Sequence, residues 1–403
     1  MKAIKKVLRS QRRGSALPLV FSVLVILLAI GTGLLSLGLH SRTFTIRTAS
    51  EIAARSAADA GLTKALFELN EMLEVKPWDD SDLPQATNET LPNCDATFSY
   101  TVTGDIDSGF TIESIGKSGR AERKVCATLR LRGLFDYAVF GVEDVGLKNR
   151  ATVDGYNYGE DGENLQVGTN SIESDAVDLK NEATVNGDVV VGVDGDPDVV
   201  INSTWGTITG QTYAMPEEQE LPPVTVPEWL QSLPSGGTIE DNDNTTISSS
   251  GKYDEIDLKN GKTVTIDGPV TLYIIGDIIL DNSAELQVVD GDEVSLTMYL
   301  AGDVEVKNNG AVNNLTEDPK KLKIYGLDSC QSIILKNGTD FYGAIYARNA
   351  DVEMKNSADA FGAVIARSFE QKNSAAFNYD ASLRDTSAND EGVHFVIERW
   401  NEE

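Results

Sequence analysis

The sequence of 403 residues has few of the side chains on which most catalytic and metal sites depend. It contains two histidines, His40 and His394, and three cysteines, Cys94, Cys126 and Cys330. None of them forms a CxxC motif or a Cys/His cluster, which excludes the usual zinc-binding patterns and a disulfide-rich scaffold. A phosphate-binding P-loop and a GxGxxG motif are also missing. We therefore expect a protein that is not an enzyme and that holds no organic cofactor.

Basic residues are scarce outside the N-terminus. The chain has 34 Lys and Arg against 63 Asp and Glu, which gives a formal net charge of -29. Residues 1–14, a basic leader, nevertheless carry six basic side chains and no acid, and the first acidic residue is Glu51. A body this acidic repels phosphate backbones, so we expect no nucleic-acid partner and favour divalent cations or basic surfaces.

An uncharged apolar run follows the leader, from Ala16 to Leu39. As a helix it would be about 36 Å long, enough to cross the ~30 Å hydrocarbon core of a bilayer. A cleaved secretory signal would have a shorter run, and a buried core helix rarely follows six basic residues. The positive-inside rule places the leader in the cytoplasm and the body outside the membrane. Positions that represent this anchor are Ala16, Leu19, Leu24, Ala29, Gly33 and Leu39.

The helical pattern continues beyond the apolar run. Apolar or small residues recur every three to four positions from Ala49 to Leu73, and Pro77 ends the pattern. Residues 16–75 are therefore predicted to form one helix, about 90 Å long. In this helical domain, residues 15–76, the first part crosses the membrane and the second part is an amphipathic stalk.

The segments RRGSALPLVFSVLVILLAIG and RTASEIAARSAADAGLTKALFELN resemble the N-terminus of PilX-type minor pilins. That family has a short basic leader ending in Gly and an AxxAAxAGLxxAL helix further on. The resemblance implies that a prepilin peptidase cuts between Gly14 and Ser15. It also implies that the helix packs against other pilin or pseudopilin subunits. Major pilins have Glu at the fifth mature position, where this chain has Leu19, so the resemblance implies a minor subunit.

Three segments of alternating apolar and polar residues follow the stalk, in a domain predicted to cover residues 77–134. The segments CDATFSYTVTG, FTIESIGKSG and RKVCATLRLRG predict a three-stranded meander. PilX-type pilins resemble this stretch too, including the I-x-S-x-G segment from Ile112 to Gly116. Cys94 and Cys126 flank the meander, where they could form a disulfide in an exported protein or remain half-buried thiols.

A short phrase, apolar-x-apolar-Lys/Asp-Asn, recurs through residues 135–385, with a degenerate copy at Ile201–Ser203. Its asparagines are Asn149, Asn181, Asn260, Asn282, Asn308, Asn337, Asn356 and Asn373. Repeats of about 20–30 residues made of short strands are typical of a β-solenoid, whose stacked coils bury a continuous core. We expect the asparagines to stack at one corner as an amide ladder. A β-sandwich with coincidental Lys-Asn turns is the alternative.

The predicted fold class is therefore a long N-terminal α-helix followed by an all-β body, with a small meander and then a β-solenoid (β-helix). The last coils, YGAIYARNADVEMKNSADAFGAVIARSFEQKNSAAFNYDASL, resemble an uncharacterised C-terminal domain of some PilX-like pilins, which implies no activity. The proline-rich segment PEEQELPPVTVPEWLQSLP, in an insertion near residues 211–238, predicts a surface excursion. Residues 386–403 predict a polar loop and a final strand that pairs elsewhere or caps the stack.

Candidate ligands for a metal are also present. Asp194, Asp196 and Asp198 have a D-x-D-x-D spacing that suits calcium, which takes six to eight oxygen ligands. A solvated acidic loop is the alternative, and the lysines of the repeat are expected to form a solvated stripe. Some β-helices are polysaccharide-active enzymes, but carboxylates lie close together by chance in so acidic a chain, so their proximity indicates no active site.

These features predict a non-enzymatic minor pilin, a pilus-assembly or adhesion protein. It would cross the inner membrane once, with its N-terminus in the cytoplasm and its body displayed at the cell surface. The alternative is a membrane-tethered structural or adhesive rod that enters no filament. Cleavage after Gly14 separates the two hypotheses, because incorporation into a pilus requires it.

Overall fold

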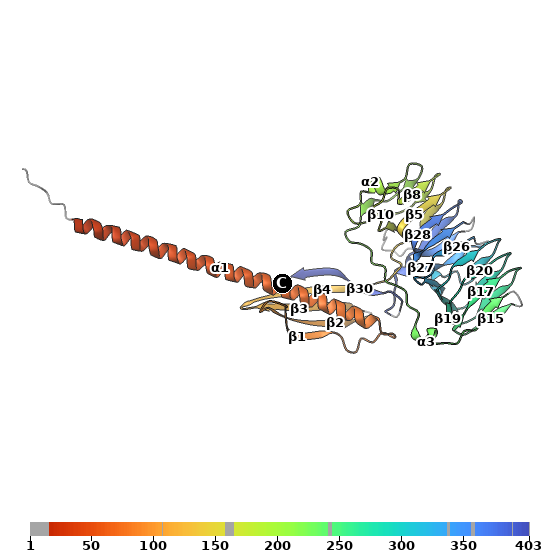
Figure 1. Ribbon diagram of the computed structural model, residues 1–403, viewed down its shortest axis with the longest axis horizontal. Helices are drawn as coiled ribbons and strands as arrows, with labels where there is room; N and C mark the ends of the chain where they lie inside the picture. The colour runs from red at the N-terminus through yellow and green to blue at the C-terminus, as the bar shows by residue number, and fades with distance from the viewer. Residues whose placement is uncertain are drawn as a thin grey trace, which may run out of the picture. The chain divides into compact units, whose positions relative to one another are not determined.

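The computed structural model describes residues 16–106, 108–157, 165–240, 244–336, 339–355, 359–388 and 390–402. Its contacts divide the chain into two compact units (Figure 1). The first unit comprises Met1–Val75, Asp79–Arg130 and Val396–Glu403, and the second comprises Lys76–Trp78 and Leu131–Phe395. The leader and the Gly14–Ser15 cleavage site lie outside the described residues.

The first unit begins with one uninterrupted helix, α1 (Ala16–Leu73), as the sequence predicts (Figure 1). Pro18 lies in its first turn, where the missing N–H breaks no helical hydrogen bond. The helix ends shortly before Pro77, because a proline disfavours helical geometry at the residue that precedes it. By length and composition α1 could cross a membrane.

A five-stranded sheet with the order β1-β2-β3-β4-β30 completes the first unit, and α1 packs on β2 and β3. Its strands are β1 (Gln85–Thr90), β2 (Thr97–Asp105), β3 (Gly109–Ser118), β4 (Ala121–Arg132) and β30 (His394–Glu402). The predicted meander corresponds to β2, β3 and β4, which pair antiparallel. The prediction of three strands was incomplete, because the polar edge strand β1 also pairs with β2 and the final strand β30 pairs with β4. The second unit is thus inserted, in sequence, between two neighbouring strands of this sheet.

The register of the sheet separates the two cysteines of the candidate disulfide. Cys126 on β4 lies opposite Glu113, which lies opposite Thr101 on β2. Cys94 precedes the first residue of β2, so it lies beyond the start of that strand and is displaced along the sheet from Thr101. Two strand spacings alone amount to about 9–10 Å, whereas a disulfide tolerates a Cα separation of at most about 7 Å. The structure accordingly has no disulfide between Cys94 and Cys126, which is the second of the two alternatives that the sequence left open.

The second unit is a β-solenoid of parallel strands, which confirms the predicted fold class. Each full coil contributes one strand to each of three faces, and each strand pairs with the equivalent strand of the next coil. Face A carries the strands that precede the repeated Asn, face B those that follow it, and face C those that complete the coil. The inward side chains of the three faces form one continuous apolar core.

In stacking order, face A consists of β14 (Thr238–Glu240), β17 (Glu255–Leu258), β20 (Ile278–Leu280), β23 (Val304–Val306), β26 (Ser332–Leu335), the last parts of β27 (Phe341–Met354), β28 (Ala360–Gln371) and β5 (Val139–Lys148), then β8 (Val177–Lys180) and β11 (Ile201–Asn202). Face B consists of β15 (Thr245–Ile247), β18 (Thr263–Ile266), β21 (Glu285–Val288) and β24 (Ala311–Asn314), the opening residues of β27 and β28 (341–343 and 360–362), then β29 (Ala376–Asp380), β6 (Thr152–Tyr156), β9 (Thr184–Val185) and β12 (Thr207–Ile208). Face C consists of β16 (Gly251–Tyr253), β19 (Pro269–Ile274), β22 (Ser295–Leu300), β25 (Leu322–Gly326), the middle parts of β27 and β28, the first part of β5, then β7 (Gln166–Thr169), β10 (Asp188–Val191) and β13 (Thr212–Ala214). Short helices α2 (Pro197–Val200), α3 (Glu228–Gln231), η1 (Pro319–Lys321) and η2 (Ala381–Arg384) lie in the connections.

The coils do not stack in the order of the sequence. The chain enters the stack in its interior at β5 and builds coils outward to β13. It then crosses to the opposite end, begins again at β14, and returns coil by coil to β28. There Val364 pairs with Val139 and Phe369 with Val145, so the last complete coil stacks on the first. Residues 215–237 make the crossing.

Candidate functional site

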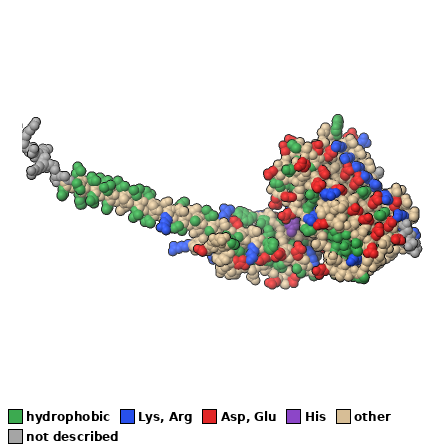
Figure 2. Space-filling model, viewed as in Figure 1, with side chains coloured by type: hydrophobic (Ala, Val, Ile, Leu, Met, Phe, Trp, Pro, Cys, Tyr) green, Lys and Arg blue, Asp and Glu red, His purple; other side chains and the backbone are tan. Residues whose placement is uncertain are grey.

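The first half of α1 exposes apolar side chains around its whole circumference. The large apolar residues from Leu17 to Leu39 are between 47 and 82% exposed, and Figure 2 shows hydrophobic side chains along this stretch. The predicted anchor residues Leu19 and Leu24 are among them, and Ala29 and Gly33 are exposed too. A surface helix in water keeps a polar face, so a helix that is apolar all round suits lipid or the interior of a helix bundle.

The second half of α1 is the opposite, because small residues bring it close to the sheet. Ala54 and Ala58 are fully buried, and a Cβ added at Gly116 on β3 would lie 2.0 Å from the Ala54 carbonyl oxygen. A Cβ at Gly61 would lie 2.3 Å from Ser114 Oγ. The AxxAAxAGL and I-x-S-x-G motifs therefore pack against each other. Together they dock the stalk on the sheet.

The repeated asparagines turn the chain from face A to face B. Those in described residues have φ between 51 and 70°: Asn149, Asn181, Asn260, Asn282, Asn308 and Asn373. Asn tolerates this left-handed conformation better than other non-glycine residues, which is why the phrase needs it. Backbone bonds link successive corners; for example, the N–H of Arg150 donates to the Asn181 carbonyl at 2.9 Å. Asn337 and Asn356 lie outside the described residues.

Side-chain hydrogen bonds between the corners are fewer than the backbone bonds among the described residues. Asn181 Nδ2 donates to Asn149 Oδ1 at 2.8 Å, one rung of the expected kind. Asn308 Nδ2 instead donates to Asp281 Oδ1 at 2.7 Å, so an acid replaces the amide there. A ladder of amides through the whole stack stays a prediction.

The degenerate copy at Ile201–Ser203 is placed differently from the expectation. Asn202 pairs with Asp178, a strand position, and does not lie at the corner. The corner of this end coil is formed by Trp205, whose carbonyl accepts the N–H of Glu182 at 2.6 Å. The side chain of Trp205 is 73% exposed.

The repeated lysines are not a merely solvated stripe, because they alternate with acids on the outward side of face A. Lys372 Nζ bonds Glu353 at 2.8 Å and also Glu370, while Lys355 and Lys148 bond the same two acids from either side. Burial raises the pKa of Glu353 and Glu370, but the lysine hydrogen bonds outweigh it and hold each pKa below its usual value. Figure 2 shows a row of Lys and Arg side chains with acids beside it on the body.

The middle coils of face C are buried on both sides. Its outward positions include, on successive coils, Tyr299, Tyr325 and Tyr346, which are at most 3% exposed. The segment before β30 lies over the first two: the Tyr299 hydroxyl donates to Glu391 at 2.9 Å, and Tyr325 lines a pocket with Glu391. The proline-rich segment covers Tyr346, and its Leu221 and Val224 pack against the core. We call residues 215–234 the strap. The predicted surface excursion is thus a segment that lies along the body and shields one face of it.

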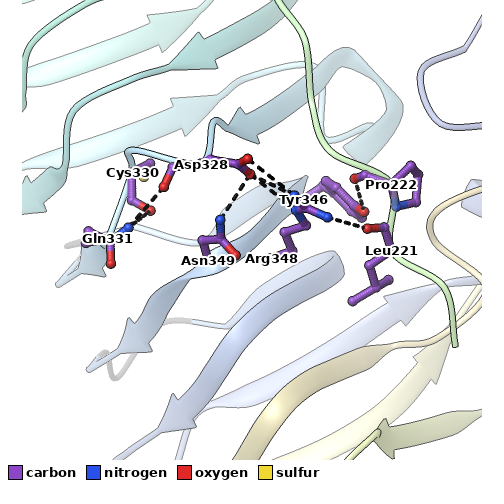
Figure 3. Close-up of polar contacts among 8 residues, drawn as sticks. All are labelled: Leu221, Pro222, Asp328, Cys330, Gln331, Tyr346, Arg348 and Asn349. Carbon is purple, nitrogen blue, oxygen red and sulfur yellow. Dashed lines mark hydrogen bonds and ion pairs between the residues drawn. The ribbon is translucent and has the colours of Figure 1, made fainter. Parts of the chain in front are cut away.

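Specific hydrogen bonds hold the strap in place (Figure 3). Tyr346 donates its hydroxyl to the Pro222 carbonyl at 2.7 Å, and Arg348 Nη1 donates to the Leu221 carbonyl at 2.9 Å. The guanidinium of Arg348 is also paired with Asp328 at 3.1 Å. Beside this cluster, burial raises the pKa of the Cys330 thiol to about 12, which keeps it protonated and unreactive. Tyrosines at the same position of successive coils could have indicated this covered face from the sequence.

The acidic residues proposed for calcium do not converge on one point. The side chain of Asp196 caps α2 by accepting the N–H of Asp198, and Asp194 is a left-handed turn residue. Within the part of the chain that the structure describes, no three Asp, Glu, His or Cys side chains are grouped in a way that could hold a metal ion. Asp194, Asp196 and Asp198 are therefore not grouped as the candidate calcium site would require, which leaves the alternative of a solvated acidic loop.

Comparisons with known proteins reach only part of the chain. A family model described as a domain of unknown function (DUF7305) matches residues 224–386, from within the strap to just after η2. Among solved structures, the chain is similar to the competence-associated pilin ComZ from Thermus thermophilus, with 16% identity over 88% of this chain and 97% of that chain. The TM-score of 0.22 is too low for that likeness to carry an argument. No curated protein matches the chain.

Proposed function

We propose that this chain is a non-enzymatic, minor pilin-like subunit that displays a β-helix at the bacterial surface. The leader stays in the cytoplasm and the first half of α1 crosses the inner membrane. A prepilin peptidase then cuts between Gly14 and Ser15, and the freed helix packs among those of other pilin or pseudopilin subunits. The body acts in pilus assembly or adhesion.

The contrast between the two halves of α1 carries this proposal. One continuous helix is docked on a sheet by its second half and is bare and apolar in its first half. A plain anchor needs only a span, whereas here the span and the docked stalk are one rigid element. Such a helix can move from lipid to a filament core without unfolding, because both environments are apolar and can surround its apolar side chains.

N-terminal sequencing of the protein from cell fractions tests the proposal. We expect Ser15 as the first residue in protein from sheared pili, and Met1 in the variant Gly14→Asp, which should stay in the inner membrane. A conservative control, Gly14→Ala, should be processed better than Gly14→Asp, because only its small methyl group must fit the peptidase. Met1 on the wild-type surface protein would contradict the proposal.

Leu19 favours a second candidate, a membrane-tethered adhesive rod. An apolar residue at this position serves lipid anchoring equally well and supplies no carboxylate for a neighbouring N-terminal amine. The same fractionation separates the two candidates, since a tethered rod remains with the membrane after shearing.

A further inference from the structure

We propose that the groove at the corner of the end coils binds a neutral oligosaccharide, with Trp205 as its stacking platform. The groove is lined by Asn149, Arg150, Asn181, Glu182, Trp205 and Ser374. This inference deepens the proposed function, because it rests on a body that is displayed outside the membrane.

Trp205 is placed where a ligand can reach it. Its backbone is fixed by the bond from the Glu182 N–H, while its side chain is 73% exposed on the last coil of the stack. Tryptophan is rarely so exposed, because its large apolar rings are costly to leave in water. A rigidly mounted, exposed indole offers a flat face for the C–H side of a sugar ring.

The side chains beside Trp205 complement hydroxyl groups. Arg150 Nε donates to Glu182 Oε2 at 2.8 Å, and both side chains are more than two-thirds exposed. The bonded amides of Asn149 and Asn181 lie on the adjoining coils. Guanidinium, carboxylate and amide groups each present paired donors or acceptors in one plane, which suits the neighbouring hydroxyls of a sugar.

Other macromolecules fit this groove less well. The net charge of -29 opposes nucleic acids and anionic glycans. The residues around Trp205 in the groove are polar or charged, so it lacks the apolar core of a protein interface. Successive corners repeat at about 4.8 Å, close to the length of one sugar unit, so an extended chain could place one ring on each coil.

The experiment is calorimetric titration of the full chain in a detergent without a sugar headgroup. The probes are hexasaccharides of β1,4-linked glucose, β1,4-linked N-acetylglucosamine, β1,4-linked mannose and α1,4-linked glucose. We expect at least one to bind, and Trp205→Ala to weaken that binding about tenfold or more, as truncation of an anchoring aromatic does. Trp205→Phe, which keeps a flat ring, should retain most of the affinity.

The control is Trp229→Ala, because Trp229 on α3 is also exposed, at 52%, and lies outside the groove. Binding by no hexasaccharide, or binding that Trp205→Ala leaves unchanged, would overturn the proposal. So would a change in oligomeric state on Trp205→Ala without sugar binding, which would assign the ring to a second copy of the chain. The titration uses purified protein, so its failure is distinguishable from failure of leader cleavage.

Discussion

Face A and face C of the β-helix use the same parallel backbone but present opposite chemistry on their outward sides. On face A the outward positions hold lysines alternating with acids, as in Glu353, Lys372 and Glu370. On face C the same positions hold tyrosines such as Tyr325 and Tyr346, which other segments bury, and the strap covers Tyr346. Stacking fixes which residues align between coils, whereas the outward residue decides whether a face stays open or requires a cover.

The largest effect should come from emptying face C. Tyr346→Ala removes a fully buried ring and the bond that holds Pro222. We expect a loss of about 3–5 kcal/mol in the free energy of unfolding, as for other buried aromatic-to-alanine changes. Urea unfolding of the full chain in detergent measures it. Tyr346→Phe keeps the ring and should cost only about 1 kcal/mol; equal losses in both variants would show that packing under the strap is unimportant.

A smaller effect is expected from breaking the charge ladder of face A. Glu353 and Glu370 lie directly opposite each other on neighbouring strands, and Lys372 bonds both. Lys372→Met leaves two part-buried carboxylates side by side, and we expect a cost of about 1–3 kcal/mol. The exposed Arg150–Glu182 pair is the control, since Arg150→Met should cost at most about 0.5 kcal/mol. Similar costs for both variants would refute the distinction.

Acid should separate the faces further. The pKa of Glu353 and of Glu370 is lowered from 4.5 in the folded protein, so their contribution is complete above pH 4.5 and is lost as the pH falls through the folded values. A phenol is protonated throughout the acid range and burial raises the pKa of Tyr346 further, so this side chain does not titrate on acidification. We expect the double variant Glu353→Gln and Glu370→Gln to lose less stability on acidification than the wild type does, in urea titrations at several pH values. An identical loss would remove the ladder as its cause.

The smallest effect should come from the corner that separates face A from face B. Asn282 has φ of 52°, and the following residue, Ser283, is also left-handed. Asn282→Gly should leave the free energy of unfolding nearly unchanged. Asn282→Ala should lower it by about 1 kcal/mol, because alanine is strained in the left-handed conformation and has no side-chain hydrogen bond to offset the strain. Thermal unfolding of the two variants compares them directly. Equal melting temperatures would contradict the role assigned to this conformation.

Local patterns predicted the elements of this fold well. The length of α1, the meander strands and the Asn corner follow from periodicity and from the φ that Asn tolerates. The stacking order was out of reach, because every coil carries the same phrase and nothing local states that β28 pairs with β5. The edge strand β1, with the sequence QATNET, escaped because it has no apolar alternation.

The site was predicted in part. The sequence indicated the apolar first half of α1 and the basic leader before it, because composition alone reveals both. It missed Trp205, since the copy phrase at Ile201–Ser203 is offset from the true corner by the geometry of the end coil. It offered Asp196 as a candidate calcium ligand beside a solvated loop, and did not indicate the helix cap that its short spacing to Asp198 forms.

The insertion of the solenoid, in sequence, between β4 and β30 has a consequence for release by proteolysis. A domain that hangs from one linker is released by a single proteolytic cut. Here a cut between residues 131 and 395 leaves the upstream fragment covalently joined to α1. The downstream fragment ends in β30, which remains hydrogen-bonded to β4. For a cut between β5 and β28, the pairing of these two strands also joins the two pieces within the stack. A protease would therefore have to cut twice, or unfold a sheet, before the solenoid separated from α1.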